Sequence, residues 1–225
     1  MSRDNILHKI RTALGRGAGQ AVAAPPPARI RIPQVPMEAR IASLLERVRA
    51  LAGEAVESDD PRAVVAAAIA GRTAIASNAP YLVECGITDL PGVRSGITDR
   101  EELRQLCAAA DIGITSADYA LADTGTLVLL SSPQEARMIS LLPPAHIAVV
   151  PRARILTGLD ELFSLLPNPA EASSSMVLIT GPSRTADIEQ ILVRGVHGPG
   201  VLSVVVTGWA RSVSDRLEKF LWGGL

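Results

Sequence analysis

Residues 176–189, MVLITGPSRTADIE, carry the pattern that decides the fold class. The segment begins as an apolar run, breaks at Gly181 and restarts with helix-like spacing from Thr185. This order predicts a strand, a tight turn and a helix start. The first backbone N–H groups of a helix have no partner within it, and the helix dipole adds partial positive charge there. The turn is therefore predicted to bind an anion, and Arg184 adds a planar fork of donors.

Part of this turn also has a structural explanation. Thr185 can cap the predicted helix, and Asp187 in its first turn suits the dipole without any ligand. The positive charge of Arg184 is unfavourable at a helix start, so the structural explanation does not cover it. The functional interpretation of the turn therefore rests on Ser183 and Arg184.

Apolar bursts like this one alternate with helix-like segments along the chain. The predicted strands cover residues 54–57, 73–76, 112–115, 127–130, 146–150, 176–179 and 201–206. The predicted helices cover residues 38–51, 60–70, 99–110, 158–166, 185–194 and 209–221. Because several of the strands are unbroken apolar runs, both of their faces are expected to be covered. The pattern predicts an α/β fold with a mainly parallel sheet and helices on both faces.

The N-terminal part has a different composition. Residues 1–20 contain a predicted helix at 4–14, residues 21–36 form a Pro/Ala-rich linker, and the compact α/β domain is predicted at 37–225. The linker composition is typical of extended chain. Two interpretations of the first helix stay open: it packs back onto the domain, or it docks a partner.

Composition narrows the function classes. The formal net charge is -1 and aromatic residues make up 3% of the 225 residues. Such a chain has neither a basic field for nucleic acid nor rings for base stacking. Cys85 and Cys107, the two cysteines, lie far apart. The sequence therefore predicts no metal site and no iron–sulfur cluster in this chain, and favours a reducing cytoplasm. No signal peptide and no membrane span of about 20 apolar residues is expected.

Two further loops hold candidate ligand-binding residues. In DYALADTGT, at 118–126, Thr124, Gly125 and Thr126 offer two hydroxyls and a flexible glycine before a buried strand. A turn needs such residues in any case, so a ligand-facing loop and a simple turn are both open. His197, in VHGPG at 196–200, is either a structural histidine or a functional one.

The strand directions decide which of these loops meet. Arg137 follows the strand at 127–130, and Gly181 follows the strand at 176–179. In a parallel sheet both lie at the carboxyl edge, where ligands gather. Thr124 and Thr126 precede their strand, so they share that edge only if the strand is antiparallel or the loop crosses the sheet.

Three stretches resemble the LutC/YkgG family of lactate-utilisation proteins, which belongs to the LUD-domain group. They are ALADTGTLVLL at 120–130, ARMISLLPPAHIAVVP at 136–151 and ITGPSRTADIEQILVRGVHGPGVLSVVV at 179–206. The resemblance implies an α/β fold of the NagB/RpiA/CoA-transferase-like type. It also implies that the chain is one of three components needed for bacterial growth on L-lactate, which is oxidised to pyruvate. The companion components of the family carry iron–sulfur motifs.

The resemblance supplies no firm catalytic residue and no cofactor. The ligand-binding candidates are Thr124, Gly125, Thr126, Arg137, Gly181, Ser183, Arg184, Thr185, Asp187 and His197. The first hypothesis is a lactate-utilisation component that binds a small anionic ligand or supports iron–sulfur partner subunits. The alternatives are a free-standing enzyme acting on a phosphorylated or CoA-linked small molecule, and a purely structural scaffold.

Overall fold

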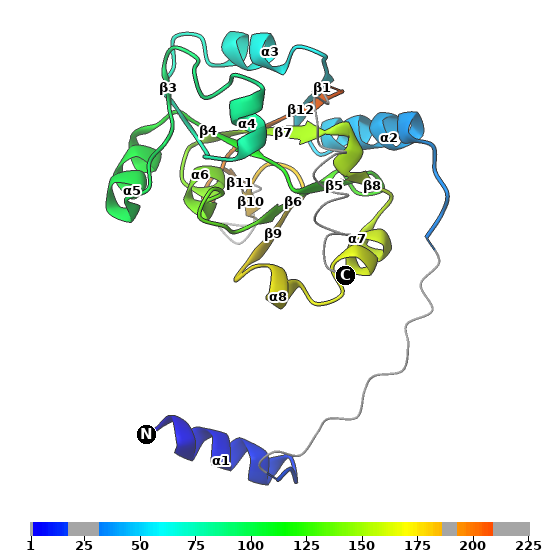
Figure 1. Cartoon of the computed structure of the whole chain (residues 1–225), viewed down its shortest axis with the longest axis vertical. Coiled ribbons are helices and arrows are strands. Elements are labelled where there is room, and N and C mark those ends of the chain that lie inside the picture. Colours follow the sequence, from blue (N-terminus) through cyan, green and yellow to red (C-terminus); the bar gives the residue numbers. More distant parts are fainter. Residues whose placement is uncertain (1, 18–31, 186–192, 209–225) are drawn as a thin grey trace, which may run out of the picture. The chain divides into compact units, whose positions relative to one another are not determined.

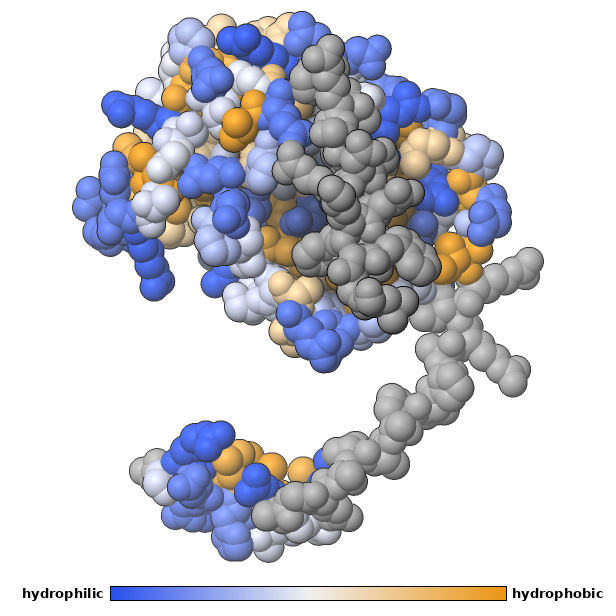
Figure 2. Space-filling view, in the orientation of Figure 1, coloured by the Kyte–Doolittle hydropathy of each residue, from blue (hydrophilic) through white to orange (hydrophobic). Residues whose placement is uncertain are grey.

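The computed structural model describes residues 2–17, 32–185 and 193–208, in two separate units, Met1–Arg31 and Ile32–Leu225 (Figure 1). The first unit contains helix α1 (Arg3–Ala13), which begins where the Ser2 hydroxyl accepts a hydrogen bond from the Asn5 backbone N–H. Its apolar residues Ile6 and Ile10 are exposed and form the hydrophobic stripe visible on α1 in Figure 2. The predicted helix at 209–221 and most of the linker lie outside the described residues.

The second unit is built on a six-stranded sheet in which every pair is parallel. The strand order is β1-β12-β7-β4-β2-β3. The strands are β1 (Glu54–Glu57), β2 (Ala74–Ala76), β3 (Val93–Arg94), β4 (Ile112–Ser116), β7 (Ala145–Pro151) and β12 (Val201–Thr207). The prediction of an α/β fold with a parallel sheet is thereby confirmed for these strands.

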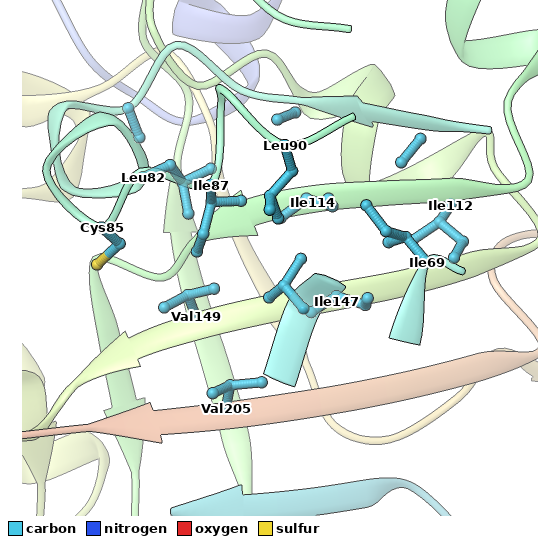
Figure 3. Close-up of a cluster of buried hydrophobic side chains, with 14 of the residues drawn as sticks. Ile69, Leu82, Cys85, Ile87, Leu90, Ile112, Ile114, Ile147, Val149 and Val205 are labelled. Atoms are coloured by element: carbon cyan, nitrogen blue, oxygen red, sulfur yellow. The ribbon is translucent and has the colours of Figure 1, made fainter. Parts of the chain in front are cut away.

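Helices cover both faces of this sheet. Helices α3 (Pro61–Ala68) and α4 (Pro80–Glu84) lie on one face, and α2 (Met37–Ala50), α5 (Arg100–Ala109) and α6 (Arg137–Leu141) lie on the other (Figure 1). Side chains alternate along β12 accordingly. Val205 joins the cluster under α3 and α4, shown in Figure 3, whereas Val204 and Val206 pack with α2. This two-sided burial explains why the strand reads as an unbroken apolar run.

A second, four-stranded mixed sheet packs against the α2 face. Its strand order is β8-β5-β6-β9, and β6 runs antiparallel to both neighbours. The strands are β5 (Tyr119–Leu121), β6 (Thr126–Leu130), β8 (Ile155–Leu156) and β9 (Met176–Ile179). Its outer face packs on α7 (Leu159–Leu165) through the fully buried Leu162. The short helices η1 (Arg152–Arg154) and α8 (Pro169–Ala172) complete this part.

The sequence pattern did not predict this second sheet. Strands 127–130 and 176–179 were expected in one mainly parallel sheet, with the direction of 127–130 left open, but they form β6 and β9, which pair antiparallel with each other. In the structure β6 is buried and β9 is only partly buried, although both arise from unbroken apolar runs. They carry no information on direction or on which sheet receives them.

The predicted helix at 185–194 is wrong at both ends. Strand β10 (Arg184–Thr185) pairs antiparallel with β11 (Val193–Arg194), and residues 186–192 lie outside the described residues. Hydrogen bonds to a later segment of the same chain, residues 195–199, hold this conformation. The Ser183 N–H donates to the Pro199 carbonyl at 2.8 Å, and the Gly195 N–H donates to the Ser183 carbonyl at 3.1 Å. The turn after β9 is therefore held by hydrogen bonds to residues 195–199.

Within the described ranges, every helix is too short or too polar to span a bilayer.

Candidate functional site

Three neighbouring strands of the parallel sheet end beside one another at a polar cluster. Ser77 follows β2, Asp118 lies two residues beyond β4, and Arg154 lies close behind β7. The loop at 131–136, which links β6 to α6, lies against this edge. The Asn78 backbone N–H donates to the Gln134 carbonyl at 2.9 Å, and the Ser77 hydroxyl donates to Glu135 Oε2 at 2.8 Å. Ligands of open α/β sheets bind at this carboxyl edge.

The sequence SSPQE at 131–135 accounts for the conformation of this loop. The Ser132 hydroxyl accepts hydrogen bonds from the backbone N–H groups of Gln134 at 3.2 Å and Glu135 at 2.9 Å. This is a serine turn, which Pro133 favours by fixing its own φ. The tight turn directs the Glu135 side chain inward, where it is 7% exposed.

Two cavities meet at Glu135. We call the larger one, of about 490 Å³, the carboxyl-edge cavity. Its polar lining comes from Asn78, Arg100, Ser131, Ser132, Gln134, Glu135, Arg137 and others. We call the smaller one, of about 280 Å³, the acidic cavity, lined by Tyr81, Asp118, Glu135 and Arg154 among others. Glu135 therefore stands between two spaces, each large enough for a small molecule.

Burial changes the acid–base state of Glu135. Loss of hydration, reinforced by the nearby Asp118 carboxyl, raises the pKa of Glu135 to about 8. Hydrogen bonds from Ser77 and from the Ser116 backbone act in the opposite direction and are outweighed. At neutral pH this side chain is consequently a carboxylic acid that carries its proton.

Asp118 is the second acid of the cluster. Burial raises its pKa, whereas the Leu130 backbone N–H, donating to Oδ2 at 2.7 Å, and the positive charge of Arg154 favour its ionised form. Arg154 also lies over the Tyr119 ring, with 5.4 Å between its guanidinium carbon and the ring centroid. Arg154 lowers the pKa of Asp118, whereas no cation is among the groups that shift the pKa of Glu135, so Glu135 is the better proton carrier of the two.

Arg137 is the sequence candidate that the structure brings to this edge. It opens α6, is exposed, and donates from Nη1 to the Ser175 hydroxyl at 3.3 Å. Arg100, at the start of α5, lines the same cavity. A guanidinium has five donors, so both side chains retain donors for an anion.

The other sequence candidates gather elsewhere. Because β6 is antiparallel to β9, Thr126 lies opposite Thr180, and their hydroxyl oxygens are 2.8 Å apart. The Thr124 and Thr126 hydroxyl oxygens are also 2.8 Å apart. The antiparallel alternative therefore holds, and the DTGT loop meets the turn at Gly181. The antiparallel direction of β6 also contradicts the expectation that Arg137 and Gly181 lie at one edge. Arg137 follows the carboxyl end of β6, whereas Gly181 lies beside the amino end of β6, near Thr126.

Gly125 has a packing reason of its own. Its φ is +71°, a left-handed conformation that L side chains rarely adopt. An added Cβ would lie 2.8 Å from the Arg47 Cβ and 2.9 Å from the Val48 nitrogen on α2. The close approach of this loop to α2 thus requires glycine, with or without a ligand.

A third cavity brings the 181–183 turn and the VHGPG loop together. It has about 210 Å³, and its polar lining includes Ser140, His146, Ser183 and His197. His146 is fully buried, which lowers its pKa to about 4, and its Nε2 lies 2.8 Å from the Thr115 hydroxyl oxygen. Among the described residues, His146 Nδ1 has no hydrogen-bond partner. His197, in contrast, is exposed.

Arg184 has a structural contact. Its guanidinium donates to the carbonyl oxygen of Leu51, the residue that ends α2. A cation is favourable at a helix carboxyl end. Thr185 lies beside it in β10, and Asp187 lies outside the described residues. Their roles in ligand binding stay predictions.

Glu135, Asp118, Ser77 and His146 were not predicted as site residues. One signal could have found Glu135: it stands in the loop after a fully apolar strand, where a carboxylate is expensive to bury. The sequence offered no sign of its partner Ser77, which is 58 residues away. Across the described residues, no three His, Cys, Asp or Glu side chains are grouped to hold a metal ion.

Comparison with known proteins places these features in a family. The family model described as the LUD domain matches residues 41–207. A solved structure of a DUF162 family protein from Deinococcus radiodurans matches with a TM-score of 0.59 and 18% identity, over 77% of this chain and 99% of that one. At this identity the likeness concerns the fold alone.

Curated relatives share more of the sequence over a shorter length. Lactate utilization protein C 1 of Bacillus mycoides (strain KBAB4) is 42% identical over 108 residues, 46% of each chain. Lactate utilization protein C of Bacillus subtilis (strain 168) is 41% identical over 120 residues, 52% of this chain and 48% of that one. The match thus spans about half the length of these relatives.

Proposed function

The chain belongs to the LUD-domain family, and we propose that it is a component of a bacterial L-lactate utilisation system, in which L-lactate is oxidised to pyruvate. The relatives named lactate utilization protein C support this process, at about 40% identity over about half of the chain. The family model covers nearly all of the α/β unit, including the carboxyl edge.

We also propose the finer fold assignment, the NagB/RpiA/CoA-transferase-like type. Two features support it: the all-parallel six-stranded sheet, and the smaller mixed sheet that packs on one of its faces. The fold by itself says little about chemistry, so the argument for function rests on the side chains at the carboxyl edge.

We propose that the carboxyl-edge cavity binds a small anionic ligand. The observation that carries this proposal is the presence of Arg100 and Arg137 on one cavity wall together with the buried acid Glu135. The guanidinium groups supply charge and forked donors for an anion. Neutral Glu135 adds no competing negative charge below its raised pKa.

We further propose that iron–sulfur partner subunits carry the electrons, in the cytoplasm. Iron–sulfur clusters are held by groups of cysteine thiolates. The two cysteines of this sequence are buried at separate places, and burial raises the pKa of each thiol to about 11. Thiols in this state suit packing better than cluster ligation.

Growth on L-lactate tests the proposed process. In a strain with no other lactate dehydrogenase, deletion of the gene is expected to abolish growth on L-lactate and to leave growth on pyruvate intact. The wild-type gene should restore growth, and Arg137→Gln should restore it poorly. Arg104→Gln, which alters an exposed arginine of α5 paired with Glu101, is the matched control and should complement fully. Normal growth of the deletion strain on L-lactate would contradict the proposal.

A further inference from the structure

Helix α1 carries an apolar stripe, yet none of its residues is buried. The stripe consists of Ile6, Ile10 and Leu14, whose spacing of four residues places them along one face of the helix. They are 44%, 49% and 61% exposed, and Figure 2 shows apolar surface gathered along one side of α1. A helix of 11 residues is marginal in water on its own. The stripe is therefore expected to pack against a further surface.

The rest of the surface of this segment is basic. Residues 2–17 contain one acid and four exposed cations, namely Asp4, Arg3, Lys9, Arg11 and Arg16. Arg3 Nη1 lies 4.0 Å from Asp4 Oδ1, which is the one salt bridge that the structure describes within residues 2–17. The charges of the other three cations are therefore available to an anionic surface.

The charge of the whole chain is divided unevenly in the same sense. Residues 1–31 contain six lysines and arginines and one aspartate. Residues 32–225 contain 16 lysines and arginines against 22 aspartates and glutamates. The net charge of -1 thus combines a basic N-terminal segment with an acidic remainder. An anionic surface attracts the first and repels the second, so its binding is expected to depend on the N-terminal segment.

The positions of the cations favour a flat surface over a groove. Lys9 and Arg11 are the sequence neighbours of Ile10, so they project about 100° to either side of it. A protein groove deep enough to enclose the stripe would also bury these two charges, which is costly unless each is paired. At the surface of a bilayer, the stripe can enter the apolar layer while the long cationic side chains reach the anionic headgroups.

We propose that α1 binds the surface of a bilayer that contains anionic lipid. Ile6, Ile10 and Leu14 face the acyl chains, and Lys9 and Arg11 lie at the level of the headgroups. The helix lies in the interface and does not cross it, because 11 residues extend about 17 Å, whereas the hydrocarbon core is about 30 Å thick. The inference is independent of the anion site proposed above.

Two substitutions in α1 separate the charge from the stripe. A basic residue at an anionic surface contributes roughly a fivefold factor in affinity, so Lys9→Gln should weaken binding about fivefold. Ile10→Ser should weaken it about tenfold, because about half of Ile10 is exposed and able to enter the apolar layer. Serine and isoleucine have similar helix propensities, so this variant should keep its helix. The matched controls are Val83→Ser, at a valine that is 54% exposed on α4, and Arg104→Gln, at an exposed arginine of α5.

Co-sedimentation of the full chain with vesicles tests the proposal. One set of vesicles contains phosphatidylglycerol and phosphatidylcholine in equal parts, and the other contains phosphatidylcholine alone. At about 0.1 M NaCl the wild type should bind the anionic vesicles at least tenfold more tightly than the neutral ones. Most of this preference should be lost at about 1 M NaCl, where the Debye length is about 3 Å instead of about 10 Å. The α1 variants should weaken binding by the factors given above, and the two controls should bind like the wild type.

Four results would overturn the proposal. Equal binding to both kinds of vesicle would exclude the role of anionic lipid, and absence of binding to either would leave a partner protein as the occupant of the stripe. Wild-type affinity of Ile10→Ser would show that the stripe stays outside the bilayer. Sedimentation velocity without vesicles provides the fourth: self-association of the wild type that Ile10→Ser abolishes would show that a second copy of the chain covers the stripe.

Discussion

Replacement of Glu135 by glutamine should remove a large part of the pH dependence of stability. In the folded chain the pKa of Glu135 rises from 4.5 to about 8 because the carboxyl is buried near Asp118. The folded state therefore holds a proton that the unfolded state releases between these pH values. Since the unfolded state then binds fewer protons, the free energy of unfolding falls as pH rises through this window.

The magnitude follows from the pKa change. One pKa unit corresponds to about 1.4 kcal/mol, so the free energy of unfolding should fall by on the order of 4 kcal/mol between pH 5 and pH 8.5. Glutamine imitates the protonated acid and has no proton to lose, so the variant should lack this slope. His146 acts in the opposite sense at lower pH: its pKa is lowered to about 4, so stability is lost as pH falls below about 6.5. Because both proteins contain His146, its contribution cancels when the free energy of unfolding of Glu135→Gln is subtracted from that of the wild type.

Urea unfolding of both proteins, followed by circular dichroism from pH 5 to pH 8.5, measures the difference. Glu102→Gln, on the exposed side of α5, is the control and should keep the wild-type slope. The reasoning is refuted if the free energies of wild type and Glu135→Gln change in parallel over this range. That result would mean that folded Glu135 is already ionised at pH 5.

Three further outcomes are expected. Gly113→Ala should unfold the domain or cost several kcal/mol, because the new Cβ would lie 1.8 Å from the Ile139 carbonyl oxygen; thermal denaturation measures this. Arg184→Gln should lower the free energy of unfolding by about 1 kcal/mol through loss of its hydrogen bond to the Leu51 carbonyl, and urea unfolding measures this. The Cys85 thiol, with a pKa of about 11, should react with iodoacetamide at pH 8 far more slowly in folded than in urea-unfolded protein; equal rates would contradict its burial.

The sequence predicted the parallel sheet because its signal is local. The runs at 146–150 and 201–206 are apolar on both sides of the strand, and β7 and β12 are indeed buried on both faces. The strand at 54–57 was located to the residue, although it is short and mostly exposed. The alternation of these strands with helix-like segments was enough to indicate a parallel sheet with helices on both faces.

The site was harder to predict because it depends on strand direction and on contacts between residues far apart in the sequence. The apolar run at 127–130 says nothing of its antiparallel pairing with β9, and that pairing separates Arg137 from Gly181. The two ends of the predicted helix at 185–194 are paired extended chain, next to a hydrogen bond from Ser183 to Pro199 that the local sequence does not reveal. Glu135 owes its raised pKa first to burial and then to the Asp118 carboxyl, and both arise only once β2, β4 and the 131–136 loop have met.

The proposed role is tested most directly by electron transfer from L-lactate in the assembled system. The partner subunits would be purified from cells with and without this chain and assayed for L-lactate-dependent reduction of an artificial electron acceptor. We expect the activity with the wild-type chain, its loss without the chain, and its restoration when the purified chain is added back. Undiminished L-lactate-dependent reduction in the absence of the chain would contradict the proposed function.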